Sequence, residues 1–248
     1  MKNPFIHLEK VNLHYASVAF KERSLKALLS NMFEVGSRTK VKDIHALKDV
    51  SIEINGGERV GLLGHNGAGK STFLKMVAGL YPVSSGHVQV QGQIRSLFDL
   101  GMGFEPDATG RENILYRGLL LGLTPPFMRG KEAEIIDFSG LGDFIDYPIK
   151  TYSAGMQVRL AFSISTAVGG DILLLDEVIG AGDANFMQKA KRRIAKLVDQ
   201  ADILVLASHD PNALKNLCQR GLVFEKGVVV FDGPIGDAVE EYQKNSQA

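Results

Sequence analysis

The stretch Gly64-His65-Asn66-Gly67-Ala68-Gly69-Lys70-Ser71 decides the fold of this chain. It matches the pattern G-x-x-x-x-G-K-[ST] and lies between a predicted buried strand at residues 58–63 and a predicted helix at residues 71–80. The glycines that open and close the pattern allow backbone angles that side chains forbid, so successive N–H groups can point at one phosphate. The alternative is a glycine-rich turn that binds nothing. Because the motif has its strand and its helix, we predict a nucleotide site.

Individual residues of this loop have predicted roles in binding the nucleotide. Lys70 offers a point charge to the β- and γ-phosphates, and Ser71 offers an oxygen to Mg²⁺. The positive end of the helix dipole adds to the attraction for phosphate. The other residues that we predict to contact the nucleotide here are Asn66, Gly67, Ala68, Gly69 and Thr72.

Composition limits the class of protein. At 248 residues the chain is long for one average domain and short for two, which favours one domain with an inserted subdomain. The 28 basic and 28 acidic side chains cancel, so no net field gathers nucleic acid, and we expect no nucleic-acid partner. The single cysteine, Cys218, excludes an internal disulfide and is expected to be a small buried hydrophobe.

The sequence shows no membrane or secretion signal. The first five residues lack the apolar segment of a secretory leader, and no apolar run approaches the ~18 residues that a membrane span needs. We therefore expect any role at a membrane to depend on a partner.

The first part of the chain predicts strands around one extra helix. Residues 5–13 and 49–54 alternate apolar and polar side chains, which indicates an antiparallel layer, and residues 88–91 predict another short strand. Between the first two of these strands, residues 21–36 place large apolar side chains on one face of a predicted amphipathic helix.

The middle and the end of the chain predict an α/β core with an inserted helical subdomain. The core takes residues 1–94 and 169–248, and the subdomain takes residues 95–168. Nearly continuous apolar runs predict parallel strands that are covered on both faces, so the fold class is α/β with a mainly parallel sheet. The predicted elements are helices at 111–121, 131–140, 156–167 and 186–199, strands at 171–177 and 202–207, and a hairpin at 222–231.

Three polar residues follow the apolar strands. Asp176 closes one strand, where an α/β sheet places its ligands and where a carboxylate can hold Mg²⁺. Glu177 is placed to polarise a water for attack on the γ-phosphate, and His209 follows the next strand, where it can contact that phosphate. The plainer alternatives are helix capping for the two acids and a structural hydrogen bond for the histidine.

A second loop resembles an anion site. Residues 152–161 read Tyr-Ser-Ala-Gly-Met-Gln-Val-Arg-Leu-Ala, a small polar turn that opens a helix. One nucleotide cannot easily occupy two such loops of the same chain. The two loops make sense if two copies pair head to tail, so that Ser153 and Gly155 of one copy face the ATP held by Lys70 of the other.

With these motifs in place, the sequence resembles the ATP-binding-cassette (ABC) family along essentially its whole length. The resemblance implies that ATP closes a sandwich of two subunits, that hydrolysis reopens it, and that Tyr15 stacks on adenine, with His45 as the rival. The motifs that carry it, in order, are Walker A (64–71), the signature (153–157), Walker B (172–176), the catalytic residue Glu177, the loop Gly180-Ala181-Gly182-Asp183, whose Asp183 joins the ATP site, and the switch residue His209.

Two departures point to one branch of that family. The signature lacks the common Leu-Ser-Gly-Gly-Gln, and residues 97–106 lack the usual glutamine, with Asp99 as the nearest polar replacement. Together with residues 109–114 and 182–186, these features look like the ATPases of bacterial exporters of lipid-linked polysaccharides, such as O-antigen, capsule and teichoic acid.

The resemblance implies a peripheral ATPase on the cytoplasmic face of the bacterial inner membrane. Its cofactors would be ATP and Mg²⁺, and its partners a second copy, a transmembrane permease and the exported lipid-linked polysaccharide. The alternatives are an ABC ATPase that acts on nucleic acid or ribosomes, one that serves another transported substrate, and a monomeric P-loop kinase or GTPase.

Overall fold

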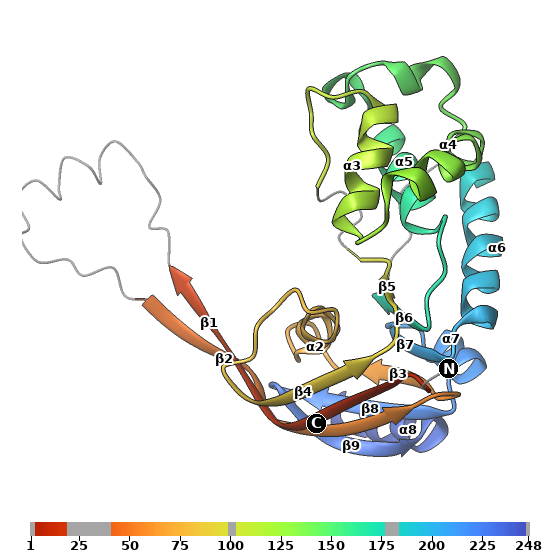
Figure 1. Ribbon diagram of the computed structural model, residues 1–248. Helices are drawn as coiled ribbons and strands as arrows, with labels where there is room; N and C mark the ends of the chain where they lie inside the picture. The colour runs from red at the N-terminus through yellow and green to blue at the C-terminus, as the bar shows by residue number, and fades with distance from the viewer. Residues whose placement is uncertain (1–2, 19–40, 99–102, 177–183, 247–248) are drawn as a thin grey trace, which may run out of the picture.

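A computed structural model describes residues 3–18, 41–98, 103–176 and 184–246 of the chain. The amphipathic helix expected at residues 21–36 lies outside these described residues, as do Asp99, Glu177 and Asp183. Figure 1 shows the described chain as a β-rich lower part, which carries both termini, and an upper part made of helices.

A three-stranded antiparallel sheet forms the first layer, in the order β2-β1-β4. Its strands are β1 (Phe5–Val18), β2 (Val41–Asn55) and β4 (Ser85–Gln91). The predicted antiparallel layer is confirmed, but β1 and β2 are longer than predicted, and their pairing continues from Leu13↔Leu47 to Val18↔Val41. The register shifts three times along this pairing, the last time after Leu13, and the part of the strands beyond that last shift was not predicted.

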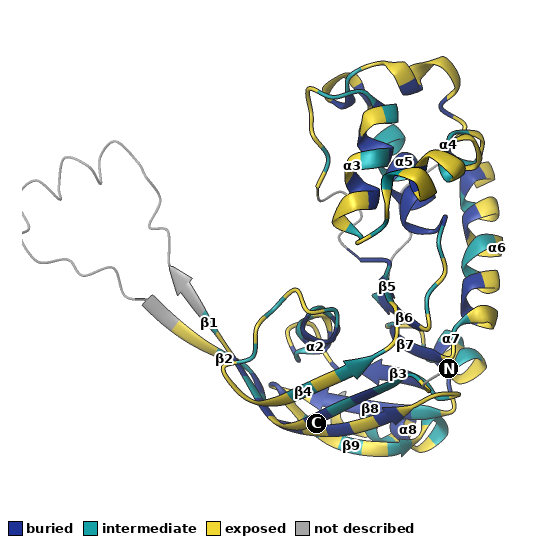
Figure 2. Cartoon of the chain, in the orientation of Figure 1, coloured by how far each residue is buried: buried dark blue, intermediate teal, exposed yellow. Residues whose placement is uncertain are grey.

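A six-stranded sheet forms the second layer, in the order β5-β6-β7-β3-β8-β9. Neighbouring strands are parallel except for β9, which pairs antiparallel with β8 as the predicted hairpin. The strands are β5 (Ile94–Ser96), β6 (Ile172–Asp176), β7 (Ile203–Ala207), β3 (Arg59–Leu63), β8 (Arg220–Glu225) and β9 (Val228–Pro234). Every residue of β7 and all but the last of β6 are buried (Figure 2), which confirms the two apolar runs as covered parallel strands.

Strand β5 corrects the predicted boundary of the helical subdomain. Residues 95 and 96 were expected in that subdomain, yet they pair with Leu173 and Leu174 of β6 in the core sheet. The side chains of Leu97 and Phe98 also pack in the two clusters that cover this sheet. A strand of three residues is too short to give a periodic pattern, so pairing alone reveals it.

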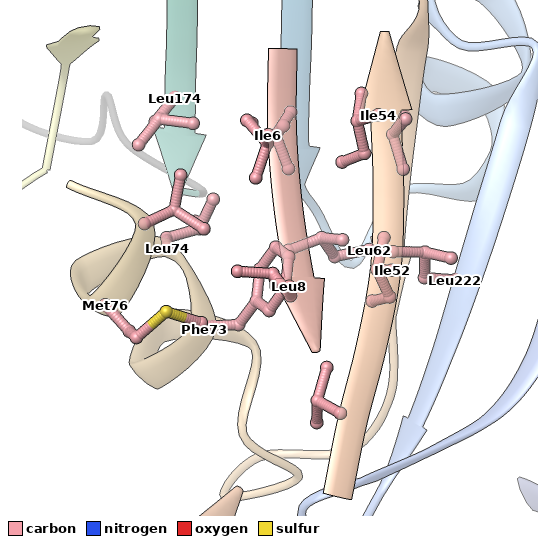
Figure 3. Packing of buried hydrophobic residues seen from close by; sticks show 14 of the residues in the cluster. Ile6, Leu8, Ile52, Ile54, Leu62, Phe73, Leu74, Met76, Leu174 and Leu222 are labelled. Atoms are coloured by element: carbon pink, nitrogen blue, oxygen red, sulfur yellow. The ribbon is translucent and has the colours of Figure 1, made fainter. Parts of the chain in front are cut away.

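Helices cover both faces of the six-stranded sheet. Helix α2 (Lys70–Val77) lies between the two sheets, where Phe73 and Leu74 pack among side chains of both layers (Figure 3). The opposite face is covered by α6 (Ala184–Gln200), α7 (Pro211–Leu217) and α8 (Ile235–Ser246). Successive strand residues serve the two faces in turn, since Leu62 packs on the first face and Leu63 on the second.

Cys218 lies in the cluster formed with these outer helices. Its side chain is buried, and burial raises the pKa of its thiol to about 12. The expectation of a small buried hydrophobe is therefore confirmed. Helices α7 and α8 were not predicted from the sequence.

The helical subdomain has its own small core. It contains α3 (Gly110–Leu120), α4 (Pro125–Ser139) and α5 (Ala154–Ser165), with short 3₁₀ turns η1 (Gly142–Asp146) and η2 (Ile149–Thr151). Helix α4 begins six residues earlier than predicted because proline is tolerated in the first turn of a helix, where its missing N–H has no partner to lose. The main buried members of this core are Ile114, Met128, Ile135, Ile145, Leu160 and Ile164. Among the described helices, none is long and apolar enough to cross a membrane.

Candidate functional site

The loop between β3 and α2 has the conformation that its glycines were expected to allow. Gly64, Gly67 and Gly69 have φ angles of 144°, 79° and 116°. A Cβ atom at Gly64 would lie 2.5 Å from the carbonyl oxygen of Phe224, so the packing around the loop excludes any side chain there. Gly69 is the N-cap of α2, and no side chain caps that helix end. No side chain therefore occupies the cap position of this helix N-terminus, where a ligand could accept from the backbone N–H groups.

Lys70 folds its side chain back over this loop. The residue is 8% exposed, and its Nζ donates hydrogen bonds to the carbonyl oxygens of Gly64 and His65, the latter at 3.1 Å. These two hydrogen bonds hold the ammonium group beside the loop. A phosphate in the loop would meet this charge in a partly desolvated place, where the attraction is stronger than in bulk water.

The turn between β8 and β9 supports the loop from the side. The N–H of Gly227 donates to the carbonyl oxygen of Ala68 at 2.9 Å, and its carbonyl oxygen accepts from the N–H of Lys48 in β2 at 2.8 Å. Gly227 has a φ of 87°, and a Cβ atom there would lie 2.6 Å from the carbonyl oxygen of Ala46. This support was missed from the sequence, where residues 222–231 indicated only a hairpin.

A pocket of about 870 Å³ opens above the loop, within the size range of ligand sites. Residues from both sheets line it, and most of the predicted site residues meet there. They are Tyr15, Asn66, Gly67, Ala68, Gly69, Lys70, Ser71, Thr72, Asp176 and His209. Lys48 and Lys226 also line the pocket, so its described walls carry three lysines against the single carboxylate of Asp176. This balance of charge suits a polyanion.

Asp176 and His209 reach the pocket from neighbouring strands. Asp176 pairs with Ala207 in the parallel register of β6 and β7, and His209 follows two residues later. Carboxyl ends of adjacent parallel strands meet at one edge of the sheet, which explains why the two side chains converge. The hydroxyl of Ser71 and the carboxylate of Asp176 are the hard oxygen donors that Mg²⁺ prefers, so the lining fits a magnesium-bound phosphate.

Both candidates for adenine stacking line the same pocket. Tyr15 donates a hydrogen bond from its Oη to Oγ1 of Thr72 at 3.1 Å and meets the ring of Tyr81 edge to face, and burial raises the pKa of its phenol. The ring of His45 stacks on that of His14 with centroids 4.0 Å apart. Thr72, which directly follows the loop, thus contacts Tyr15 on the aromatic wall of the pocket, which is formed by Tyr15 and His45.

The signature residues lie elsewhere. Ser153 caps α5, and its Oγ accepts a hydrogen bond from the N–H of Met156 at 3.2 Å. Neither Ser153 nor Gly155 lines the pocket above the phosphate loop. In Figure 1, α5 belongs to the helical part of the molecule and α2 to the β-rich part. The described part of one chain therefore does not bring the two predicted phosphate sites together.

Comparison with known proteins agrees with this geometry. The family model described as ABC transporter matches residues 47–180. The chain is 45% identical over 194 residues to the O-antigen export system ATP-binding protein RfbE of Yersinia enterocolitica, which covers 78% of this chain and 81% of that protein. It is 36% identical over 242 residues to an O-antigen export system ATP-binding protein RfbB of Klebsiella pneumoniae, with 98% of each chain covered.

Some relatives are much longer than the region they share with this chain. The teichoic acids export ATP-binding protein TagH of Lactococcus lactis is 38% identical over 211 residues, which are 85% of this chain but 45% of that protein.

The solved structures that resemble this chain include a dimeric post-hydrolysis state of the ATP-binding cassette MJ0796 bound to ADP and Pi. It covers 93% of this chain and has a TM-score of 0.66 at 21% identity, which supports the fold. The family match, the near-complete alignment to a curated relative and the architecture together show that the chain belongs to the ABC transporter family, as an ATP-binding and ATP-hydrolysing subunit.

Proposed function

We propose that this chain hydrolyses Mg-ATP in a head-to-tail dimer and thereby drives the export of a lipid-linked polysaccharide through a separate transmembrane permease. Lys70 and the loop amides bind the phosphates, and Ser71 and Asp176 hold Mg²⁺. Glu177 orients or deprotonates the attacking water, and His209 senses the γ-phosphate. Phosphoryl transfer asks for positioning and charge stabilisation more than for covalent chemistry, which these residues can provide.

The surroundings of Gly155 are the observation that supports the proposed dimer. Apart from the residues on either side and its own helix backbone, the nearest described atom to a Cβ at Gly155 would be Ser153 Oγ, at 3.9 Å. The described part of the chain leaves room for a larger residue at this helix N-terminus. A glycine at such a position suits close approach by a group from outside the chain, and the phosphate of an ATP bound to a second copy has the right charge for a helix N-terminus.

The exported molecule is inferred from relatives. Proteins named for O-antigen export and for teichoic acids export are 45% and 38% identical to this chain over most of its length. Both names refer to polymers that contain sugars, so a lipid-linked polysaccharide is the substrate class they share. In this proposal the chain works peripherally at the cytoplasmic face of the bacterial inner membrane, where ATP is supplied.

Two experiments test the proposal. Purification of the tagged chain from detergent-solubilised membranes should recover a membrane protein with several spanning helices, together with a glycolipid detectable by mass spectrometry. Deletion of the chain should leave completed polymer inside the cell. If the tagged chain recovers ribosomes or nucleic acid instead, the export function is wrong and the rival class of ABC ATPase is correct.

A further inference from the structure

Lys226, in the turn between β8 and β9, has a backbone conformation that lysine rarely adopts. Its φ angle is 48°. Side chains with a Cβ atom are disfavoured in this left-handed region by about 1 kcal/mol or more, whereas glycine and asparagine tolerate it. A residue kept in an unfavourable conformation is a reason to look for a function at that place.

The turn that carries Lys226 is fixed against the phosphate loop. Gly227 bonds both to Ala68 in the loop and to Lys48 in β2, and its Cα lies 3.5 Å from the position of a Cβ atom at Gly69. The turn cannot shift without disturbing the loop. Lys226 is therefore presented at a constant place on the wall of the ATP pocket, which it lines.

The charge of Lys226 has no counterpart within the described part of the chain. Lys226 is exposed, and its ammonium forms no ion pair with a described residue. Lys48 and Lys70 line the same pocket, so three cations surround a space whose described lining holds one carboxylate. The chain as a whole has a formal net charge of zero, which makes this a local concentration of positive charge. The triphosphate of ATP carries several negative charges that would complement it.

We propose that Lys226 binds the phosphates of the ATP held in the same chain, as a cation that the C-terminal hairpin adds to the Walker A lysine. The inference rests on the assignment of this pocket as the ATP site and is independent of the molecule that is exported. It also explains why a lysine occupies a turn position that suits glycine or asparagine better. The alternative is an ordinary solvated lysine at a hairpin tip.

Lys10 provides a matched control. It too is an exposed lysine in the left-handed region, with a φ of 47°, but it does not line the pocket. Lys226→Asn and Lys10→Asn each remove one positive charge and relieve similar backbone strain. Both variants should fold, with melting temperatures equal to or above that of the parent. A difference in nucleotide binding between them therefore reports on position and not on charge or stability.

Titration calorimetry with ATP, ADP and AMP on the full chain tests the proposal. Lys226→Asn should weaken ATP binding about three- to tenfold, ADP binding less, and AMP binding hardly at all. The reason is that the attraction between an exposed cation and a nucleotide grows with the negative charge of the nucleotide. The loss should shrink at high salt. Lys10→Asn should change none of these affinities, and Lys226→Arg should keep the affinity of the parent.

The outcomes separate this inference from the site assignment. If Lys226→Asn leaves ATP binding unchanged, or weakens all three nucleotides equally, Lys226 does not bind phosphate. Lys70→Ala serves as the reference, since it should weaken ATP binding severely. If Lys70→Ala has no effect, the pocket is not the ATP site, and the proposal for Lys226 is overturned with it.

Discussion

Helices α2 and α5 both begin at a short glycine-containing loop, yet the two helix ends are held in different ways. Gly69 caps α2 with a φ of 116° and no side-chain hydrogen bond. Ser153 caps α5 in an extended conformation, and its hydroxyl oxygen accepts from the N–H of Met156. The second end is capped by its own sequence neighbours, whereas the loop before the first is held by Gly227, which is distant in the sequence and donates a hydrogen bond to Ala68.

The glycines of the two loops also differ in the space around them. Gly64 is required by the chain itself, since the carbonyl oxygen of Phe224 occupies the space that a side chain would need. Gly155 meets no such obstacle in the described structure. The phosphate loop is thus shaped by its own subunit, whereas the described structure leaves room at the signature loop for a larger residue, as the proposed dimer requires.

Glu177→Gln should lower the rate of ATP hydrolysis by about 10²–10⁴-fold, because the amide has the shape of the carboxylate but cannot act as a base. ATP binding should remain, and the variant should accumulate as an ATP-bound dimer that cannot reopen. A coupled phosphate-release assay and size-exclusion chromatography at saturating Mg-ATP measure the two effects. Near-normal turnover would show that Glu177 is not the base.

Gly155→Asp should abolish most hydrolysis by preventing the dimer, a reduction of roughly tenfold or more. The new carboxylate would meet the partner's γ-phosphate at short range, and like charges repel. In contrast to Glu177→Gln, this variant should stay monomeric with ATP while Lys70-dependent binding survives. Equal loss of ATP binding by the monomer would mean that the signature loop acts within its own chain.

Replacing one glycine of each loop by alanine compares the two positions directly. Gly64→Ala should reduce the free energy of unfolding by about 2–4 kcal/mol, because it combines an unfavourable φ with a steric clash. Gly155→Ala should leave stability unchanged or raise it by up to about 1 kcal/mol, since alanine favours helix more than glycine does. Urea denaturation measures both. A strong destabilisation by Gly155→Ala would show that this glycine, too, serves the fold of its own subunit.

The smallest effects concern the aromatic wall of the pocket. Tyr15→Ala should weaken ATP binding by about 1–3 kcal/mol if its ring stacks on adenine, and Tyr15→Phe should lose only the hydrogen bond to Thr72, at about 0.5–1.5 kcal/mol. We expect His45→Ala to weaken binding less than Tyr15→Ala does. Calorimetric titration with ATP decides the order, and a larger loss for His45→Ala would assign the stacking to that histidine.

Features that depend on neighbouring residues could be predicted from the sequence. The motif predicted the positive φ angles of Gly64 and Gly69, and the apolar runs predicted β6 and β7 as strands covered on both faces. The order of Asp176 and His209 after those strands was enough to expect them at one edge of a sheet. These conclusions follow because helix and strand periodicity, and the steric freedom of glycine, are local properties of the chain.

Only the tertiary structure decided how distant segments meet. Strand β5 has three residues and is defined by its pairing with β6, and the outer ends of β1 and β2 follow a register shift. Helix α4 begins at Pro125, six residues before its predicted start. The hydrogen bonds of Gly227 to Ala68 and Lys48 join segments far apart in the chain, and they bring Lys226 to the ATP pocket. No periodic pattern records such contacts, because strand pairing and turn packing depend on which backbones come together in space.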